Sequence, residues 1–157
     1  TVDTAFARVS AACAEADRQG GKTGINPLIE RSYGHLHALG HAHSVEVWDG
    51  ERLIGGLYGV SLGAAFFGES MFSLATDASK IALAHLVARM KAGGYRLLDT
   101  QFVADHLKQF GAVEIGRAAY QDLLRDAVAA EGDFYVLGGA GAAVLAGTVL
   151  QLTTQTS

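Results

Sequence analysis

The chain has 157 residues, half of them hydrophobic, and a formal net charge of −4. This length and apolar content suffice for one globular core and exclude a disordered segment. The negative charge argues against a broad phosphate-binding surface, because nucleic-acid affinity comes largely from clustered Lys and Arg. The single cysteine excludes an internal disulfide framework. Since no basic and then apolar leader opens the chain, we expect a cytoplasmic protein.

The first half of the chain predicts a helix followed by three strands. Asn26-Pro27 marks a helix start, because Asn can cap free amides and Pro fits the first helical position; Gly40 marks its end. Residues 43–60, HSVEVWDGERLIGGLYGV, predict an antiparallel hairpin that turns at Asp49-Gly50. The next strand is expected at residues 64–70, AAFFGES.

The second half begins with a change of period to about 3.6 at Asp77, which predicts a helix over residues 77–92 that lies on the sheet. A strand over residues 95–101 should follow. After it we expect a short helix from Asp105, a strand at 112–115 and a helix at 117–130.

An apolar tail rich in Gly and Ala closes the chain. We predict one domain over residues 1–131 and a separate tail over 132–157. The apolar core of this tail is shorter than the roughly 20 residues that a membrane span needs, and glycines interrupt it. We therefore expect a packed or loose tail and no membrane association.

One predicted strand ends in polar residues, in the stretch RLLDTQFVADHL. Side chains alternate along a strand, so Asp99 and Gln101 should point to one face about 7 Å apart. Glu69 ends another strand after two phenylalanines. If both strand ends share one edge, two acids and an amide converge on an apolar pocket, a mixed lining typical of small-ligand sites. The predicted walls are Leu57, Phe66, Leu86 and Met90. Polar groups that only satisfy loop amides or face solvent remain the alternative.

Four histidines in HLHALGHAH (residues 35–43) raise the question of a metal site. His35 and His37 project from different sides of a helix, and His41 and His43 follow the glycine stop. No nearby Cys or carboxylate cluster completes a ligand shell. We expect histidines that form hydrogen bonds or line a cleft, with no metal and no cofactor.

Several motifs together resemble one bacterial family, the leucyl/phenylalanyl-tRNA–protein transferases. They are LHALGHAHSVEVWDGERLIGGLYGVSLGAAFFGESMFS, the helix start DASK, and LLDTQFVADHLKQFGAVEI. The motifs match in order and spacing over residues 22–124. The resemblance implies an α+β fold, with an acetyltransferase-like (GNAT) mixed, mainly antiparallel sheet flanked by helices. It also implies transfer of Leu or Phe, less readily Met, from aminoacyl-tRNA to proteins that begin with Lys or Arg, which marks them for degradation.

The resemblance also implies roles for individual residues. Asp99 and Gln101 match the catalytic acid and amide, Glu69 matches a glutamate that helps hold the acceptor, and Tyr33 matches an aromatic that holds the terminal adenosine of the tRNA. The implied pocket for the apolar amino acid is lined by Leu57, Phe66, Leu86, Met90 and Leu98. The implied partners are the aminoacyl-adenosine end of the tRNA and the acceptor protein, and we expect a monomer.

Two alternatives remain. The first is a remnant that binds peptide or aminoacyl-adenosine without catalysis, because Gly24 stands where the family usually has Trp, Leu74 replaces a frequent Arg, and the family's amino-terminal domain is missing from this chain. The second is an acetyl-CoA-dependent acetyltransferase. It is disfavoured because no glycine-rich loop opens the helix over 77–92.

Overall fold

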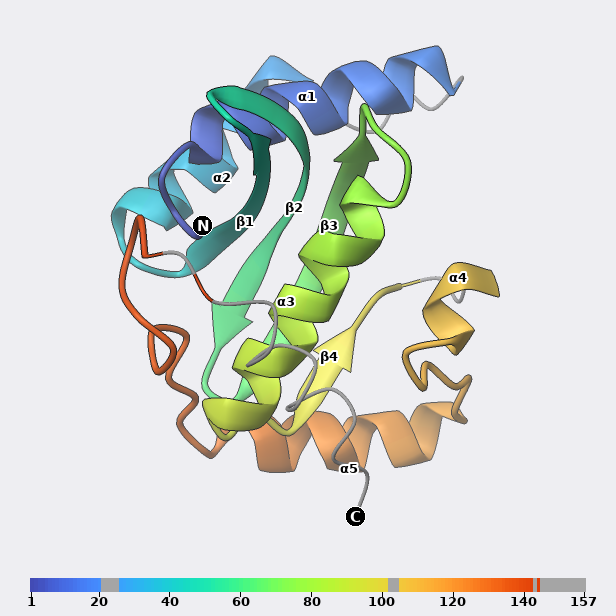
Figure 1. Ribbon diagram of the computed structural model, residues 1–157. Helices are drawn as coiled ribbons and strands as arrows, with labels where there is room; N and C mark the ends of the chain where they lie inside the picture. The colour runs from blue at the N-terminus through green and yellow to red at the C-terminus, as the bar shows by residue number, and fades with distance from the viewer. Residues whose placement is uncertain (21–25, 102–104, 143, 145–157) are drawn as a thin grey trace.

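The computed structural model describes residues 1–20, 26–101, 105–142 and 144. Its centre is a sheet of four strands in the order β1-β2-β3-β4 (Figure 1). Strands β1 (Ala42–Asp49), β2 (Arg52–Leu62) and β3 (Ala65–Ser73) are antiparallel neighbours, whereas β4 (Leu97–Asp99) runs parallel to β3. This mixed, mainly antiparallel sheet confirms the predicted α+β class.

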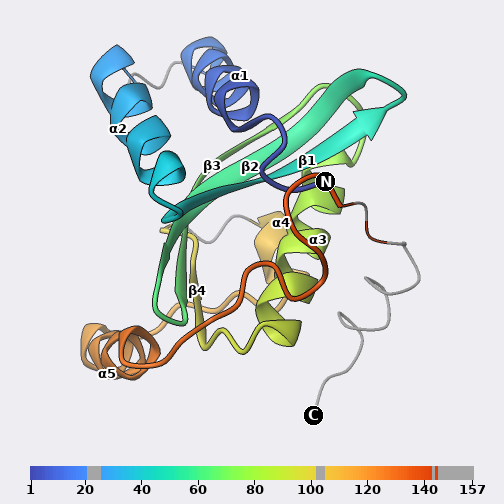
Figure 2. The same cartoon turned by 90° about the vertical axis from the view of Figure 1, so that its left-hand side faces the viewer.

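Helices cover both faces of this sheet (Figure 2). Helices α1 (Phe6–Gln19) and α2 (Pro27–Ala38) lie on one face, and α3 (Ala78–Ala92) lies on the other. The short α4 (Asp105–Lys108) follows β4, and α5 (Arg117–Val128) crosses one end of the sheet (Figure 1). In the described part of the chain, no helix has both the length and the apolar character to cross a membrane.

Local sequence signals account for the confirmed elements. The Asn26 side-chain oxygen accepts the backbone N–H groups of Leu28 and Ile29, each at 3.0 Å, so two free amides of α2 are capped. Gly50 turns the β1–β2 hairpin with φ of 58°, a left-handed conformation in which a residue with a Cβ would be strained.

The sequence prediction was wrong at two places after α3. The strand expected over residues 95–101 is shorter, because β4 ends at Asp99 and Gln101 is left-handed with φ of 60°. Residues 112–115 form no strand. Their alternation of apolar and polar residues is β-like, but Val113 is 72% exposed and Ile115 is 43% exposed, so no burial supports an extended ladder there.

Two hydrophobic clusters hold the layers together, one on each face of the sheet. The α3 face buries Val2, Val45, Leu57, Phe66, Ala82, Leu83, Leu86, Met90, Leu107 and Phe134. The face under α1 and α2 buries Phe6, Val9, Cys13, Ala42, Leu53, Tyr58 and Phe72.

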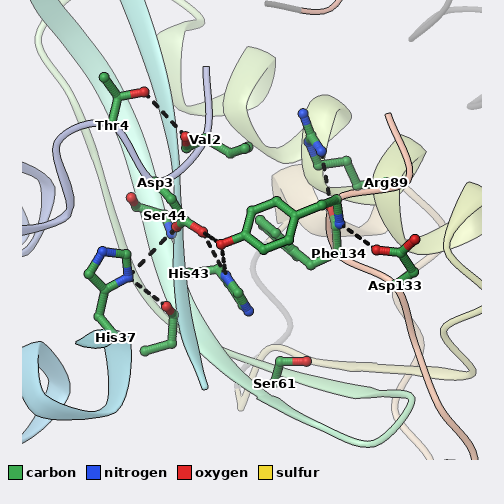
Figure 3. Close-up of polar contacts among 12 residues, drawn as sticks. Val2, Asp3, Thr4, His37, His43, Ser44, Ser61, Arg89, Asp133 and Phe134 are labelled. Carbon is green, nitrogen blue, oxygen red and sulfur yellow. Dashed lines mark hydrogen bonds and ion pairs between the residues drawn. The ribbon is translucent and has the colours of Figure 1, made fainter. Parts of the chain in front are cut away.

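The segment after α5 joins this core through a buried polar network (Figure 3). Arg89 lies fully buried on α3 and donates from Nη1 to the carbonyl oxygens of Phe134 and Gly138, each at 3.0 Å. The Phe134 ring stacks on His43 with centroids 4.1 Å apart, and the Tyr135 hydroxyl donates to Asp3. Residues 133–138 of the predicted tail therefore contact the core, whereas residues 143 and 145–157 lie outside the described part.

Gly93 offers a test of this contact. A Cβ at Gly93 would lie 2.1 Å from the carbonyl oxygen of Asp133, and a backbone oxygen cannot move aside without moving the segment. We expect Gly93→Ala to lower the free energy of unfolding by about 1–3 kcal/mol in urea denaturation. The matched control is Gly34→Ala in α2, where a Cβ meets nothing within 4 Å, and this variant should be neutral or slightly more stable. Equal stability of both variants would contradict the packing of Asp133 on Gly93.

Candidate active site

The parallel pairing of β3 and β4 brings Glu69 to the end of β4. Phe67 pairs with Asp99 in this register, so Glu69, two residues further along β3, lies level with Gln101, the second residue after β4 ends. The Gln101 side-chain nitrogen Nε2 donates to Glu69 Oε2 at 3.4 Å. The two predicted acids and the amide therefore gather at one edge of the sheet. The prediction that Glu69 ends its strand was wrong, because β3 pairs with β2 as far as Ser73 and Glu69 lies at a bulge within it.

Asp99 and Gln101 are joined by a turn and not by strand alternation. The Gln101 backbone N–H donates to Asp99 Oδ1 at 2.8 Å, a side-chain turn that replaces the strand ladder. This bond favours the left-handed conformation of Gln101, which costs a residue with a Cβ about 1–2 kcal/mol. The carboxylate of Asp99 therefore holds the backbone of Gln101, whose side-chain amide contacts Glu69.

Tyr33 approaches Glu69 from α2. Burial, followed by a hydrogen bond to the Glu69 carboxylate, raises the pKa of the Tyr33 hydroxyl. The Tyr33 ring packs edge-on against Tyr58, with centroids 5.3 Å apart. An aromatic ring and a carboxylate thus lie side by side next to the Asp99–Gln101 turn.

Tyr120 is a neighbour of Asp99 that the sequence interpretation missed. Its hydroxyl donates to Asp99 Oδ2 at 2.6 Å, from the first turn of α5. A tyrosine at the start of an amphipathic helix carries no sign of a partner 21 residues earlier. No pattern in the sequence would have identified this contact.

A small apolar cavity lies between α3, β4 and α4. Its volume is about 130 Å³, and its lining is Leu83, Val87, Leu98, Thr100, Leu107, Phe110, Gly111 and Ala112. This volume is close to that of an apolar protein cavity of roughly 150 Å³ that can hold a benzene ring. Thr100 places the cavity directly beside the Asp99–Gln101 turn.

The predicted pocket residues occupy two different positions. Leu98 lines the cavity and is partly buried against the core. The other four, Leu57, Phe66, Leu86 and Met90, lie together in the core with at most 5% of their surface exposed. Their contact with a donor side chain stays a prediction.

Two of the four histidines, His37 and His43, make side-chain hydrogen bonds. His37 Nδ1 lies 2.8 Å from the carbonyl oxygen of Ala42, and His43 Nδ1 lies 2.7 Å from Asp3 Oδ2. Within residues 1–20, 26–101 and 105–142, no group of three or more His, Cys, Asp or Glu side chains is arranged to hold a metal ion.

Fold and site together define an α+β domain that gathers two acids and an amide at the end of its edge strand, beside an apolar cavity. Comparison with known proteins places the chain within a group of transferases. The chain belongs to the leucyl/phenylalanyl-tRNA protein transferase family, whose family model matches residues 1–125.

Several relatives carry the name leucyl/phenylalanyl-tRNA–protein transferase. The one from Paramagnetospirillum magneticum is 65% identical over 127 residues, which cover 81% of this chain and 61% of the relative. The Caulobacter vibrioides relative is 64% identical over 87% of this chain and 63% of its own length. The Phenylobacterium zucineum relative is 58% identical over 99% of this chain and 72% of its own length. The chain thus spans 61% to 72% of the length of these relatives.

Proposed function

We propose that this chain is the catalytic part of an aminoacyltransferase. It would transfer Leu or Phe, and less readily Met, from aminoacyl-tRNA to proteins that begin with Lys or Arg, and so mark them for degradation in the cytoplasm. The observation that carries the proposal is the meeting of Glu69, Asp99 and Gln101 at one strand end beside an apolar cavity. We expect the chain to act as a monomer.

The chemistry requires little base strength. The donor is an activated ester, and the acceptor is an α-amine with an unperturbed pKa of about 8, so a fair fraction is already unprotonated near neutrality. The enzyme must mainly hold the amine against the ester carbonyl. Such placement can be worth roughly 7–11 kcal/mol of the barrier.

The gathered side chains suit this task. The amide of Gln101 donates to Glu69 through Nε2, which leaves its carbonyl oxygen to accept an N–H of the attacking amine. The negative charge of Asp99, two residues away, compensates the ammonium charge that develops when the amine attacks. Glu69 offers a carboxylate to the cationic amino terminus of the acceptor.

Tyr33 provides a further contact in this proposal. Its ring would pack against the terminal adenosine of the tRNA. Stacking of a base on an aromatic side chain contributes about 1–3 kcal/mol to binding. The interaction of the Tyr33 hydroxyl with the Glu69 carboxylate, which contributes to the raised pKa of Tyr33, would then connect the donor end of the site with the acceptor end.

The cavity beside Thr100 is a candidate place for the donor side chain, and this can be tested on Leu98. We expect Leu98→Ala to enlarge the cavity and to raise the transfer of a bulkier amino acid relative to Leu by about 10-fold. The reason is that a change of one methylene group in a pocket alters discrimination between substrates by about 10–200-fold. The measurement is kcat/KM for each donor tRNA.

Met90→Ala provides the comparison for this test. If the donor pocket extends into the core, Met90→Ala should also change donor selectivity. If the pocket is the cavity alone, Met90→Ala should lower only the stability of the protein, because Met90 is 5% exposed and packs in the core. Unchanged selectivity in both variants would contradict the assignment of the donor pocket to this face of the sheet.

The remnant is the second candidate. The position where the family has a frequent Arg is occupied by Leu74, which is 65% exposed and offers no charge to a tRNA phosphate. Gly24 lies within residues 21–25, which are outside the described part of the chain. Incubation of the chain with labelled Phe-tRNA and a peptide beginning with Arg distinguishes the two candidates, because transfer supports the enzyme, whereas peptide binding without transfer supports the remnant.

A further inference from the structure

The structure points to Tyr120 as a positioning residue of the transfer reaction. We propose that its hydroxyl holds the Asp99 carboxylate, and through it Gln101, in the orientation that the reaction needs. This inference rests on the proposed function, because it assigns a role within the same site.

The Asp99 carboxylate is held from two sides by groups of different elements. Its Oδ1 accepts the Gln101 backbone N–H at 2.8 Å, and its Oδ2 accepts the Tyr120 hydroxyl at 2.6 Å. One bond alone leaves the carboxylate free to rotate about its Cβ–Cγ bond. Two bonds to its two oxygens fix the plane of the carboxylate.

The position of Asp99 matters because Gln101 depends on it. Gln101 is left-handed, and the bond from its N–H to Asp99 stabilises that conformation. If the carboxylate turned away, Gln101 would lose this bond and would favour other backbone conformations. Its side-chain amide would then leave the position beside Glu69.

Tyr120 is suited to this role by its chemistry and by its place in the fold. Its hydrogen bond to Asp99, and to a smaller extent burial, raises the pKa of the phenol, so the hydroxyl stays a donor at neutral and mildly alkaline pH. Helix α5 is itself anchored to the sheet, because the Ala127 carbonyl oxygen accepts the N–H of Ala64 at 2.8 Å. A side chain on a helix that is anchored in this way is held in position more precisely than a side chain on a loop.

The kinetic test is the variant Tyr120→Phe, which keeps the ring and removes only the hydroxyl. We expect kcat to fall by about 10- to 100-fold, as expected for the loss of a hydrogen bond to a charged group. The KM for Phe-tRNA should change less than about two-fold, because binding contacts remain. The control is Tyr95→Phe, which loses a hydroxyl bonded to Ser61 Oγ away from the site and should leave kcat unchanged.

A double-mutant cycle distinguishes positioning through Asp99 from a general effect on the fold. In an Asp99→Ala background, Tyr120→Phe should have no further effect on kcat, because alanine leaves the Tyr120 hydroxyl without its acceptor. Wild-type kcat in Tyr120→Phe, or the same fold-loss in both backgrounds, would overturn the proposal. Absence of transfer by the unmodified chain would instead contradict the proposed function.

A second measurement needs no activity. The measurement is a pH titration of the tyrosines followed by phenolate absorbance. One tyrosine should titrate at a lower pH in Asp99→Asn than in the unmodified chain, because the carboxylate that favours the protonated phenol of Tyr120 has been removed. This difference should vanish when Tyr120→Phe is present in both chains. If Asp99→Asn leaves every tyrosine titration unchanged, the contact between Tyr120 and Asp99 is absent in solution and the proposal fails.

Discussion

The Asp99→Ala variant is expected to lose at least about 100-fold of the transfer rate, because misplacement of a reacting group by about 1 Å can cost that much. Alanine removes the acceptor of the Gln101 N–H and of the Tyr120 hydroxyl together. It also removes the negative charge that compensates the developing ammonium. Gln101→Ala should give a loss of similar size, since it deletes the amide that this carboxylate orients.

The measurement is single-turnover transfer from labelled Phe-tRNA to a peptide that begins with Arg. Asp122→Ala is a suitable control, because Asp122 is an exposed acid on α5 that forms an ion pair with Arg125 of the same helix. It removes the same charge from the same part of the protein and should retain full rate. A transfer rate of Asp99→Ala within about three-fold of the rate of the unmodified chain would contradict a role of Asp99 in the mechanism.

Asp3→Ala is expected to lower the free energy of unfolding by roughly 3–5 kcal/mol, because buried donors that lose their acceptor cost about 1–3 kcal/mol each. The Asp3 side chain is 2% exposed and accepts from His43 Nδ1 at 2.7 Å, from the Ser44 N–H at 2.8 Å and from the Tyr135 hydroxyl (Figure 3). The carboxylate therefore ties the start of the chain to β1 and to the segment after α5.

Urea denaturation measures this loss, and Tyr135→Phe is a graded comparison. That variant removes one donor and leaves the carboxylate with two, so it should lose only about 1.5–3 kcal/mol. A loss of less than about 1 kcal/mol in Asp3→Ala would show that water replaces the network at no cost.

The same carboxylate predicts a dependence of stability on pH. Burial by itself raises the pKa of Asp3, but the hydrogen bonds from His43, Tyr135 and Ser44 outweigh it and lower the net pKa below the ordinary 3.8. A folded pKa below the unfolded one means that the stabilisation is complete above the unfolded value and is lost as pH falls through the folded value. The stability difference between the unmodified chain and Asp3→Asn should therefore shrink below about pH 4. A difference that grows in acid would contradict this sign.

The sequence determined those features that depend on neighbours along the chain. Asn26-Pro27 starts α2 because its cap and its missing N–H act within one helical turn, and Gly50 turns the hairpin because only local backbone conformation matters there. The acids and the amide of the candidate site were also predicted from the sequence, through the polar strand end and the family motifs.

The tertiary structure decided what depends on contacts between distant segments. The residues 112–115 have a β-like pattern, yet they form no strand, since a strand needs a partner and a buried face that the pattern cannot supply. Asp99 and Gln101 meet through a turn, which alternation did not predict. Tyr120 on α5 reaches Asp99 across 21 residues of sequence, and the buried Arg89 on α3 finds its acceptors in the carbonyl oxygens of Phe134 and Gly138. Local conformation is encoded in adjacent residues, whereas these contacts depend on the packing of the whole domain.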